Sequence, residues 1–271
     1  ASDVYKRQDI IRAIERTITD AGFTMVMQQI GTCDDEVKCG AVMEREKRLQ
    51  GIVFLGGRFD YTPADLAMLN VPFVCCSYSN RYGTLIEGEY SSVSIADGDT
   101  AQQAVEELYR HGHRRIAALI SRPNDQSISQ LRYEGYVQAL ESHGIPVDPE
   151  LVICTGGFGA KDAYRAVQEK MAENVDFTAL FAIADSMAIG AMRALMDAGR
   201  RIPEDCSVIA IDGLELSAYI EPPLTTLCQP MEEMGRRSAE ILLDMVRHKG
   251  SHACELLPTT LRQGRSVAAP G

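Results

Sequence analysis

The residues best able to bind a ligand through the backbone form the glycine-rich run TGGFGAKDA, residues 155–163. Its glycines precede a predicted helix, and the N–H groups of a helix N-terminus can hold a phosphate. The run lacks the GxGxxG spacing, however, and a tight strand-to-helix turn accounts for the glycines. The sequence also contains no GxxxxGK[ST], GxSxG or HExxH motif. We therefore expect a turn here, and no catalytic residue, metal site or cofactor in the chain.

The histidines and cysteines form no ligand pattern. The five histidines lie at predicted helix ends, where a cation is favourable: His111, His113, His143, His248 and His252. The eight cysteines form no CxxC and have no zinc-finger spacing: Cys33, Cys39, Cys75, Cys76, Cys154, Cys206, Cys228 and Cys254. Scattered cysteines within apolar runs are typical of a reducing compartment, so we expect a cytoplasmic protein.

The overall charge and hydropathy exclude two further classes. A net charge of −11 disfavours contact between these residues and nucleic-acid phosphates. No apolar run approaches the ~20 residues of a membrane span, so we expect no membrane contact.

Alternating helical and strand patterns run through most of the chain. We expect helices at residues 9–21, 34–50, from 62, 97–111, 129–142, from 161, 185–198 and 231–248. We expect strands at residues 23–30, 51–56, 72–77, 91–95, 115–120, 151–155, 179–184 and 207–212, with one or two edge strands in 256–267. Short apolar strands that are each followed by a helix indicate parallel sheets covered on both faces. The predicted fold class is α/β, with two doubly wound parallel-sheet lobes and a ligand cleft between them.

The region 179–239 carries the most specific pattern, in which IPEDCSVIAID is followed by PPLTT, QP and MG. Together with LYRHGHRRIAALI, LRYEGYVQAL and LLPTTLRQGRS, it resembles the effector-binding region of the LacI/GalR family of bacterial transcription regulators. The resemblance extends over nearly everything from Asp9 onward. It implies a fold like that of the type I periplasmic sugar-binding proteins, with two lobes joined by three crossovers.

The resemblance also implies domain boundaries. The N-terminal lobe comprises 9–120 plus 231–250 and lacks its first strand, and the C-terminal lobe comprises 121–230 plus 251–271. The helix-turn-helix headpiece, which contacts operator DNA in this family, precedes the region. Residues 1–8, ASDVYKRQ, resemble the translation of a transposase sequencing adapter, so we interpret them as a non-native scar.

Four candidate ligand-binding residues of the C-terminal lobe come from matching positions in the family. Arg132 matches an arginine that points into the cleft, where its fork can grip two hydroxyls or a carboxylate. Asp212 ends a strand, the position of a ligand-facing acid, although it could cap the next turn. Phe158 matches an aromatic that stacks on the effector ring, although it could pack on its own lobe. For Asp185 we favour an N-cap role over a ligand contact.

The N-terminal lobe contributes two further candidates: Ser77, where the family frequently has Asp, and Tyr78 beside it. This chain also has Ala184 where the family often has Asn, and Gly213 where many members have a second acid or Asn. These departures leave the identity of the effector open.

The resemblance implies an effector-sensing and dimerisation region of a repressor-type regulator and a homodimer. The expected effector is a mono- or oligosaccharide, with a purine as the second choice. The alternative is the sugar-binding protein of an ABC transporter, which the PPLTT segment and the cysteines disfavour. An enzyme is the third class.

Overall fold

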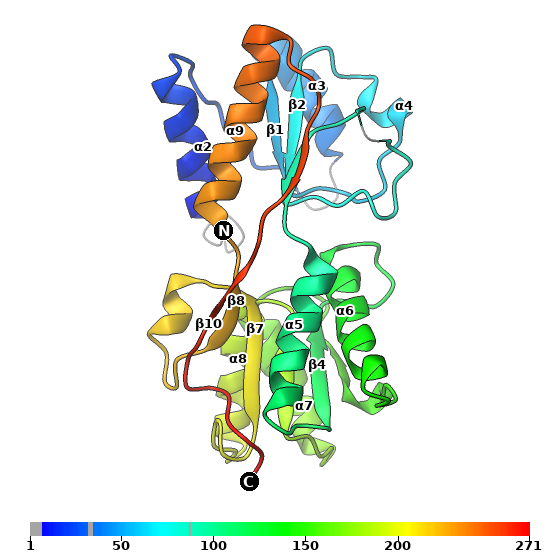
Figure 1. The fold of residues 1–271 in the computed structure, drawn as a ribbon, viewed down its shortest axis with the longest axis vertical. Helices are drawn as coiled ribbons and strands as arrows, with labels where there is room; N and C mark the ends of the chain where they lie inside the picture. The colour runs from blue at the N-terminus through cyan, green and yellow to red at the C-terminus, as the bar shows by residue number, and fades with distance from the viewer. Residues whose placement is uncertain (1–6, 32–34, 87) are drawn as a thin grey trace. The chain divides into compact units, whose positions relative to one another are not determined.

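A computed structural model describes residues 7–31, 35–86 and 88–271 and divides the chain into two compact units (Figure 1). Unit 1 contains the residues up to Ile95 together with Pro230–Leu257, and unit 2 contains Ala96–Gln229 and Pro258–Gly271. Of the eight residues interpreted as a scar, 1–6 lie outside the described residues, and Gln8 begins the first described helix.

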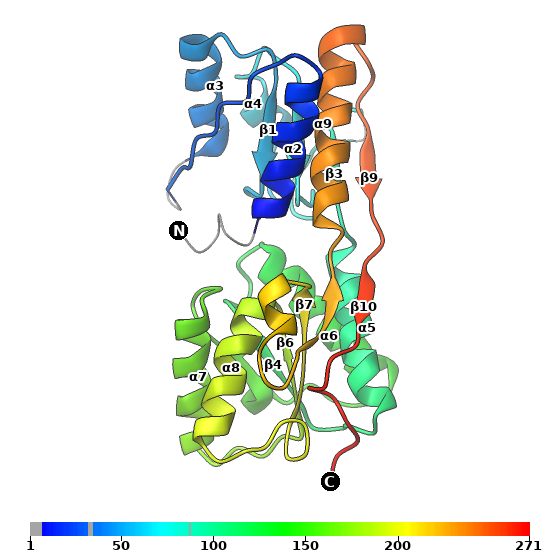
Figure 2. The same cartoon turned by 90° about the vertical axis from the view of Figure 1, so that its left-hand side faces the viewer.

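Among its described residues, unit 1 is built on a parallel sheet of four strands in the order β1-β2-β3-β9. Its elements are α2 (Gln8–Asp20), α3 (Glu36–Lys47), β1 (Ile52–Leu55), α4 (Pro63–Leu66), β2 (Phe73–Cys76), β3 (Ser92–Ser94), α9 (Met231–His248) and β9 (Cys254–Leu256). Helix α9 packs on β1, β2 and β3, and α2 lies beside α9 (Figures 1 and 2). Gly235 permits this close approach, since a Cβ there would overlap the backbone carbonyl of Ile10.

Unit 2 is built on a six-stranded sheet in the order β10-β8-β7-β6-β4-β5, in which only β10 is antiparallel to its neighbour. Its helices are α5 (Asp97–Arg110), α6 (Ile128–Ser142), η1 (Pro149–Leu151), α7 (Ala160–Ala172), α8 (Asp185–Asp197) and η2 (Glu215–Ala218). Its strands are β4 (Ile116–Ile120), β5 (Val152–Cys154), β6 (Ala179–Ala182), β7 (Ser207–Asp212), β8 (Thr225–Cys228) and β10 (Thr260–Arg262). The helices pack in the pairs α5–α6 and α7–α8.

The predicted boundary between the lobes was wrong at its first crossing. The chain enters unit 2 after Ile95 rather than after Ile120, because β4 lies between β6 and β5 and α5 packs on α6. The tail is also divided differently, since β9 pairs with β3 and therefore keeps residues up to Leu257 in unit 1. Hydrophobic periodicity identifies a strand but does not say which sheet it joins.

The strand expected at residues 23–30 does not form. This segment has no regular secondary structure, and the side chains of Val26 and Met27 are exposed. Within the described part of unit 1, β1 is the outermost strand on one side and pairs only with β2. A β-strand requires a partner for its backbone ladder, and alternating apolar residues alone do not supply one.

Candidate functional site

Arg132 is the centre of a buried charged cluster in unit 2. Only 2% of its surface is exposed. Its Nε donates to Asp97 Oδ1 at 2.9 Å, and its Nη1 donates to Asp212 Oδ1 at 3.2 Å and to the carbonyl of Ile183. Its Nη2 is buried and has no hydrogen-bond partner among the described residues. The guanidinium is therefore held from two sides and retains one unused donor group.

Helix packing brings Asp97 to Arg132. Gly135 lies one turn after Arg132 on α6, and a Cβ at that position would overlap the carbonyl of Gly98. The close approach of α5 and α6 places the first residue of α5 within hydrogen-bond distance of the guanidinium. Asp97 was missed as a site residue, because its sequence context indicates only the start of a helix.

The cluster contains two carboxylates and one guanidinium. Burial opposes the charge on Arg132, but the carboxylates of Asp97 and Asp212 outweigh it and raise the pKa of Arg132 above its ordinary value. Burial raises the pKa of Asp97, and the charge of Arg132 opposes that rise. The arginine therefore stays charged, and the cluster has an excess of acid groups.

Asp212 has a strained backbone at the carboxyl end of β7. Its φ of 139° lies outside the left-handed helical region that non-glycine residues occasionally visit. Such conformations cost roughly 1–3 kcal/mol and concentrate at functional sites. Its Oδ1 also accepts a hydrogen bond of 2.8 Å from Gln229 Nε2, a second residue that sequence reasoning missed. The following Gly213 has a φ of 78° and lies against Cys228, so no side chain fits there.

Asp185 is closed off inside unit 2 rather than facing solvent. Its Oδ2 accepts hydrogen bonds from Leu214 N at 2.8 Å and Ser217 Oγ at 2.7 Å, and its Oδ1 accepts one from Thr226 Oγ1 at 2.6 Å. Burial and the charge of Asp212 raise the pKa of Asp185 to about 7. The predicted N-cap position belongs to Ala184, and Asp185 is the first helical residue. Its contacts hold the segment that follows Asp212.

Phe158 lies half-buried in the turn between β5 and α7. Its carbonyl accepts a hydrogen bond of 2.8 Å from Ser186 Oγ, which links this turn to the start of α8. Gly156 has a φ of 79°, and Gly159 is the N-cap of α7. The glycine-rich run therefore forms the tight strand-to-helix turn that its spacing predicted.

Ser77 and Tyr78 lie in unit 1, at the carboxyl end of β2. Ser77 is half-buried with a φ of 59°, and its N–H donates to the carbonyl of Val93 at 2.9 Å. The Tyr78 ring is buried, with its centroid 5.6 Å from that of Tyr61 in a stacked arrangement. Burial raises the pKa of Tyr78 above its usual range. Tyr78 is thus part of the aromatic packing of unit 1.

Metal-ligand groups, disulfides and membrane-spanning helices are the remaining features of the described residues to report. No group of three or more His, Cys, Asp or Glu side chains is placed to hold a metal ion among the described residues. The described cysteines are free thiols, and Cys33 lies outside them. In the part of the chain that the structure describes, no helix combines the length and apolar character needed to cross a membrane.

Comparisons with known proteins identify the family. Residues 105–267 match the periplasmic binding protein-like domain. The HTH-type transcriptional regulator MalR of Clostridium butyricum is 34% identical over 257 residues, which are 93% of this chain and 75% of MalR.

Two solved structures share the fold. The transcriptional regulator CelR in complex with cellobiose is 29% identical with a TM-score of 0.85, and the match covers 97% of this chain and 79% of CelR. A LacI family regulator from Enterococcus faecium with bound ribose is 26% identical with a TM-score of 0.78, covering 97% of this chain and 94% of that one. The relatives are transcriptional regulators rather than enzymes, and a transporter's binding protein is not favoured. This chain belongs to the LacI family of transcriptional regulators and contains its effector-binding region.

Proposed function

We propose that this region senses a neutral mono- or oligosaccharide and so controls operator binding by a repressor. The repressor acts in the cytoplasm as a homodimer. Operator DNA is then contacted by a helix-turn-helix headpiece outside these residues, since this part is acidic. The relatives named as HTH-type and LacI family regulators support the regulatory role. The neighbours solved with cellobiose and ribose support a sugar effector.

The observation that carries the proposal is the buried guanidinium of Arg132, whose Nη2 has no hydrogen-bond partner in the described part of the chain. A buried donor without a partner costs free energy, and a ligand hydroxyl that accepts its hydrogen bond removes this cost. Asp212 supplies an acceptor for sugar hydroxyls beside it, and Gln229 and Asp97 hold the two charged groups in place. Because the cluster has two carboxylates to one guanidinium, a neutral effector is favoured over a phosphorylated or carboxylated one.

The other candidate residues take different roles in this proposal. Phe158 offers an aromatic face to the apolar side of a sugar ring. Ser77 stays a predicted ligand residue of unit 1, with a half-buried side chain. Tyr78 supports Ser77 through the aromatic packing behind it. Asp185 is a positioning residue, because both its oxygens accept hydrogen bonds from the protein. In the regulator, the effector shifts the population between DNA-binding and non-binding conformations.

A ligand screen with a matched variant tests the sugar site. Cellobiose, ribose, other neutral sugars and glucose 6-phosphate are added separately while the melting temperature is measured. We expect a neutral sugar to raise the melting temperature, Gln229→Ala to reduce that shift, and Arg165→Ala to preserve it. Arg165 is an exposed arginine of unit 2 that pairs with Asp162 and serves as the control. Stabilisation by glucose 6-phosphate alone, or an unchanged shift in Gln229→Ala, contradicts the proposal.

Exposed apolar side chains of unit 2 support the homodimer. Tyr219 is 77% exposed just after η2, and Leu216 of η2 and Met196 of α8 are also exposed. Helix α8 and η2 contact each other. Exposed apolar side chains on neighbouring elements are typical of protein interfaces. Sedimentation velocity tests this: Tyr219→Glu should shift the protein to monomer, and Leu256→Glu in unit 1 should not. A wild-type protein that stays monomeric at high concentration contradicts the homodimer.

A further inference from the structure

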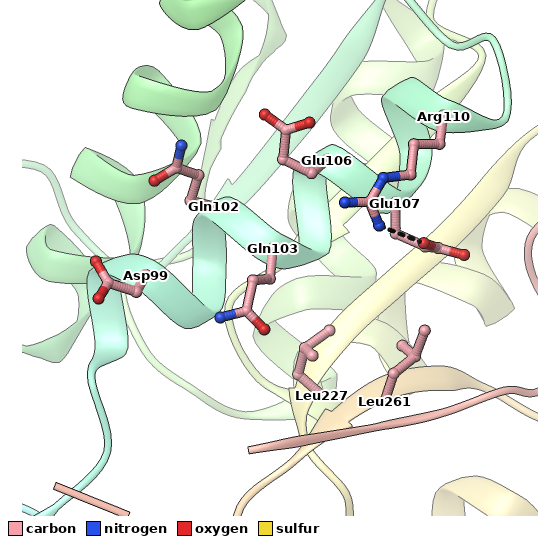
Figure 3. A pocket seen from close by; sticks show the side chains of 8 residues that line it. All are labelled: Asp99, Gln102, Gln103, Glu106, Glu107, Arg110, Leu227 and Leu261. Carbon is pink, nitrogen blue, oxygen red and sulfur yellow. Dashed lines mark hydrogen bonds and ion pairs between the residues drawn. The ribbon is translucent and has the colours of Figure 1, made fainter. Parts of the chain in front are cut away.

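A groove of unit 2 lies outside the cluster around Arg132. It runs between α5 and the strands β8 and β10 (Figure 3), and we call it the α5 groove. Its lining residues are Asp99, Gln102, Gln103, Glu106, Glu107, Arg110, Leu227 and Leu261. The six residues from α5 follow helical spacing and therefore form one continuous polar stripe.

The floor of the groove is a pair of leucines. Leu261 of β10 is directly opposite Leu227 of β8 in the antiparallel ladder, so both side chains point to the same face of the sheet. Figure 3 shows these two side chains pointing toward α5. Leu227 is buried, whereas Leu261 is 43% exposed. The apolar surface of β8 is thus covered, and that of β10 is not.

An extended chain can bind beside this floor through its backbone. In the described part of unit 2, β10 is the outermost strand and pairs only with β8. The next residue, Arg262, faces the other side of the sheet, where it donates to Ser217 Oγ and to the carbonyl of Leu214. An outer strand with an exposed apolar side chain is a template for strand addition.

The rim of the groove is acidic. It has three carboxylates and one guanidinium, which belongs to Arg110. Arg110 Nη1 lies 3.4 Å from Glu107 Oε2. Glu106 accepts a hydrogen bond of 2.8 Å from His143 Nε2 and is half-buried. Complementary charge steers association, so this rim attracts cationic side chains and repels phosphates and anionic membranes.

From these observations we propose that the α5 groove is a docking site for an extended basic segment of a partner protein. The segment adds along β10, places an aliphatic side chain over Leu261, and directs lysine or arginine side chains to Glu106, Glu107 and Asp99. This interaction surface is independent of the effector proposed above.

The test uses a fluorescein-labelled peptide of alternating lysine and leucine, and a control peptide in which glutamate replaces lysine. Fluorescence anisotropy with the full chain at low salt should show binding of the basic peptide only. Neutralising Glu106→Gln and Glu107→Gln together should weaken it roughly tenfold. Leu261→Ser, which changes no charge, should weaken it about fivefold.

The matched control is the double variant Glu150→Gln with Glu169→Gln, which makes the same charge change elsewhere on unit 2. Both of these glutamates are exposed. It should retain wild-type affinity for the peptide. An equal loss in this control means non-specific attraction to an acidic protein and overturns the proposal. Unchanged affinity in Leu261→Ser overturns it as well. Self-association that Leu261→Ser abolishes, measured by sedimentation without peptide, assigns the groove to a second copy and also overturns it.

Discussion

Units 1 and 2 are built from the same alternation of short strands and helices, yet their sheets differ in completeness. In unit 2, β7 and β6 each have a parallel neighbour on both sides, and residues of β6 are fully buried. In the described residues of unit 1, β1 pairs on one side only, and the apolar residues at 23–30 remain outside any strand. Apolar alternation yields a strand only where the neighbouring backbone is present to pair with it.

The units also differ in how they use buried charge. Unit 2 encloses the Asp97–Arg132–Asp212 cluster and the carboxyl group of Asp185, whereas the carboxyl end of β2 in unit 1 is packed with aromatic rings. Burial of a charge requires a partner and a rigid surrounding. The complete sheet of unit 2 supplies that surrounding, and four measurements test this difference.

The largest effect is expected from Arg132→Leu. Removing the guanidinium leaves two buried carboxylates without a counter-charge, which should lower the free energy of unfolding of unit 2 by about 3–5 kcal/mol. Urea unfolding followed by circular dichroism measures it, with Arg165→Leu as the exposed control. A loss below about 1 kcal/mol means that the cluster is hydrated, and the difference between the units then disappears.

The next largest effect is expected in the hydrogen-exchange rates of β7 and β1. Backbone amides of β7 should exchange at least about a hundredfold more slowly than those of β1, because local opening costs least at a strand with one neighbour. Mass spectrometry of peptides that contain each strand measures the ratio. Equal protection shows that β1 is as stably paired as β7.

Two valine substitutions, one in each unit, should differ in their effect on the unfolding free energy, by a smaller amount than the effects above. Val208→Ala in β7 removes two fully buried methyl groups and should cost about 2 kcal/mol. Val26→Ala, at a side chain that is 51% exposed, should cost less than about 0.5 kcal/mol. Chemical denaturation compares the two variants. Similar losses in both would show that residues 23–30 are packed after all.

The smallest effect concerns pH. Because the pKa of Asp185 is raised to about 7, the native state binds a proton that the unfolded chain has released above its ordinary pKa of about 3.9. As the pH rises from about 3.9 to about 7, the unfolding free energy of the wild type should therefore fall relative to that of Asp185→Asn. The measurement is the difference in unfolding free energy between the two proteins at pH 5 and pH 8. We expect at least about 1 kcal/mol, and a constant difference excludes the raised pKa.

The sequence by itself determined the α/β class, the family and most helices and strands. Local rules suffice for these: the helix expected from residue 62 forms as α4, where Thr62 and Asp65 make a capping box, and the spacing of Ile10, Ile14 and Ile18 buries one face of α2. Arg132 and Asp212 were also predicted as site residues, through their resemblance to family positions, and the structure joins them by a hydrogen bond.

Tertiary structure alone decided the rest. It decided that β4 belongs to unit 2, that residues 23–30 do not form a strand, and that Asp97 and Gln229 reach the charged cluster. It also placed both oxygens of Asp185 inside the protein. Each of these depends on a partner far away in the chain, as Asp97 and Arg132 are 35 residues apart. Periodicity and capping act over one or two turns, so they do not specify which distant backbone or side chain completes a contact.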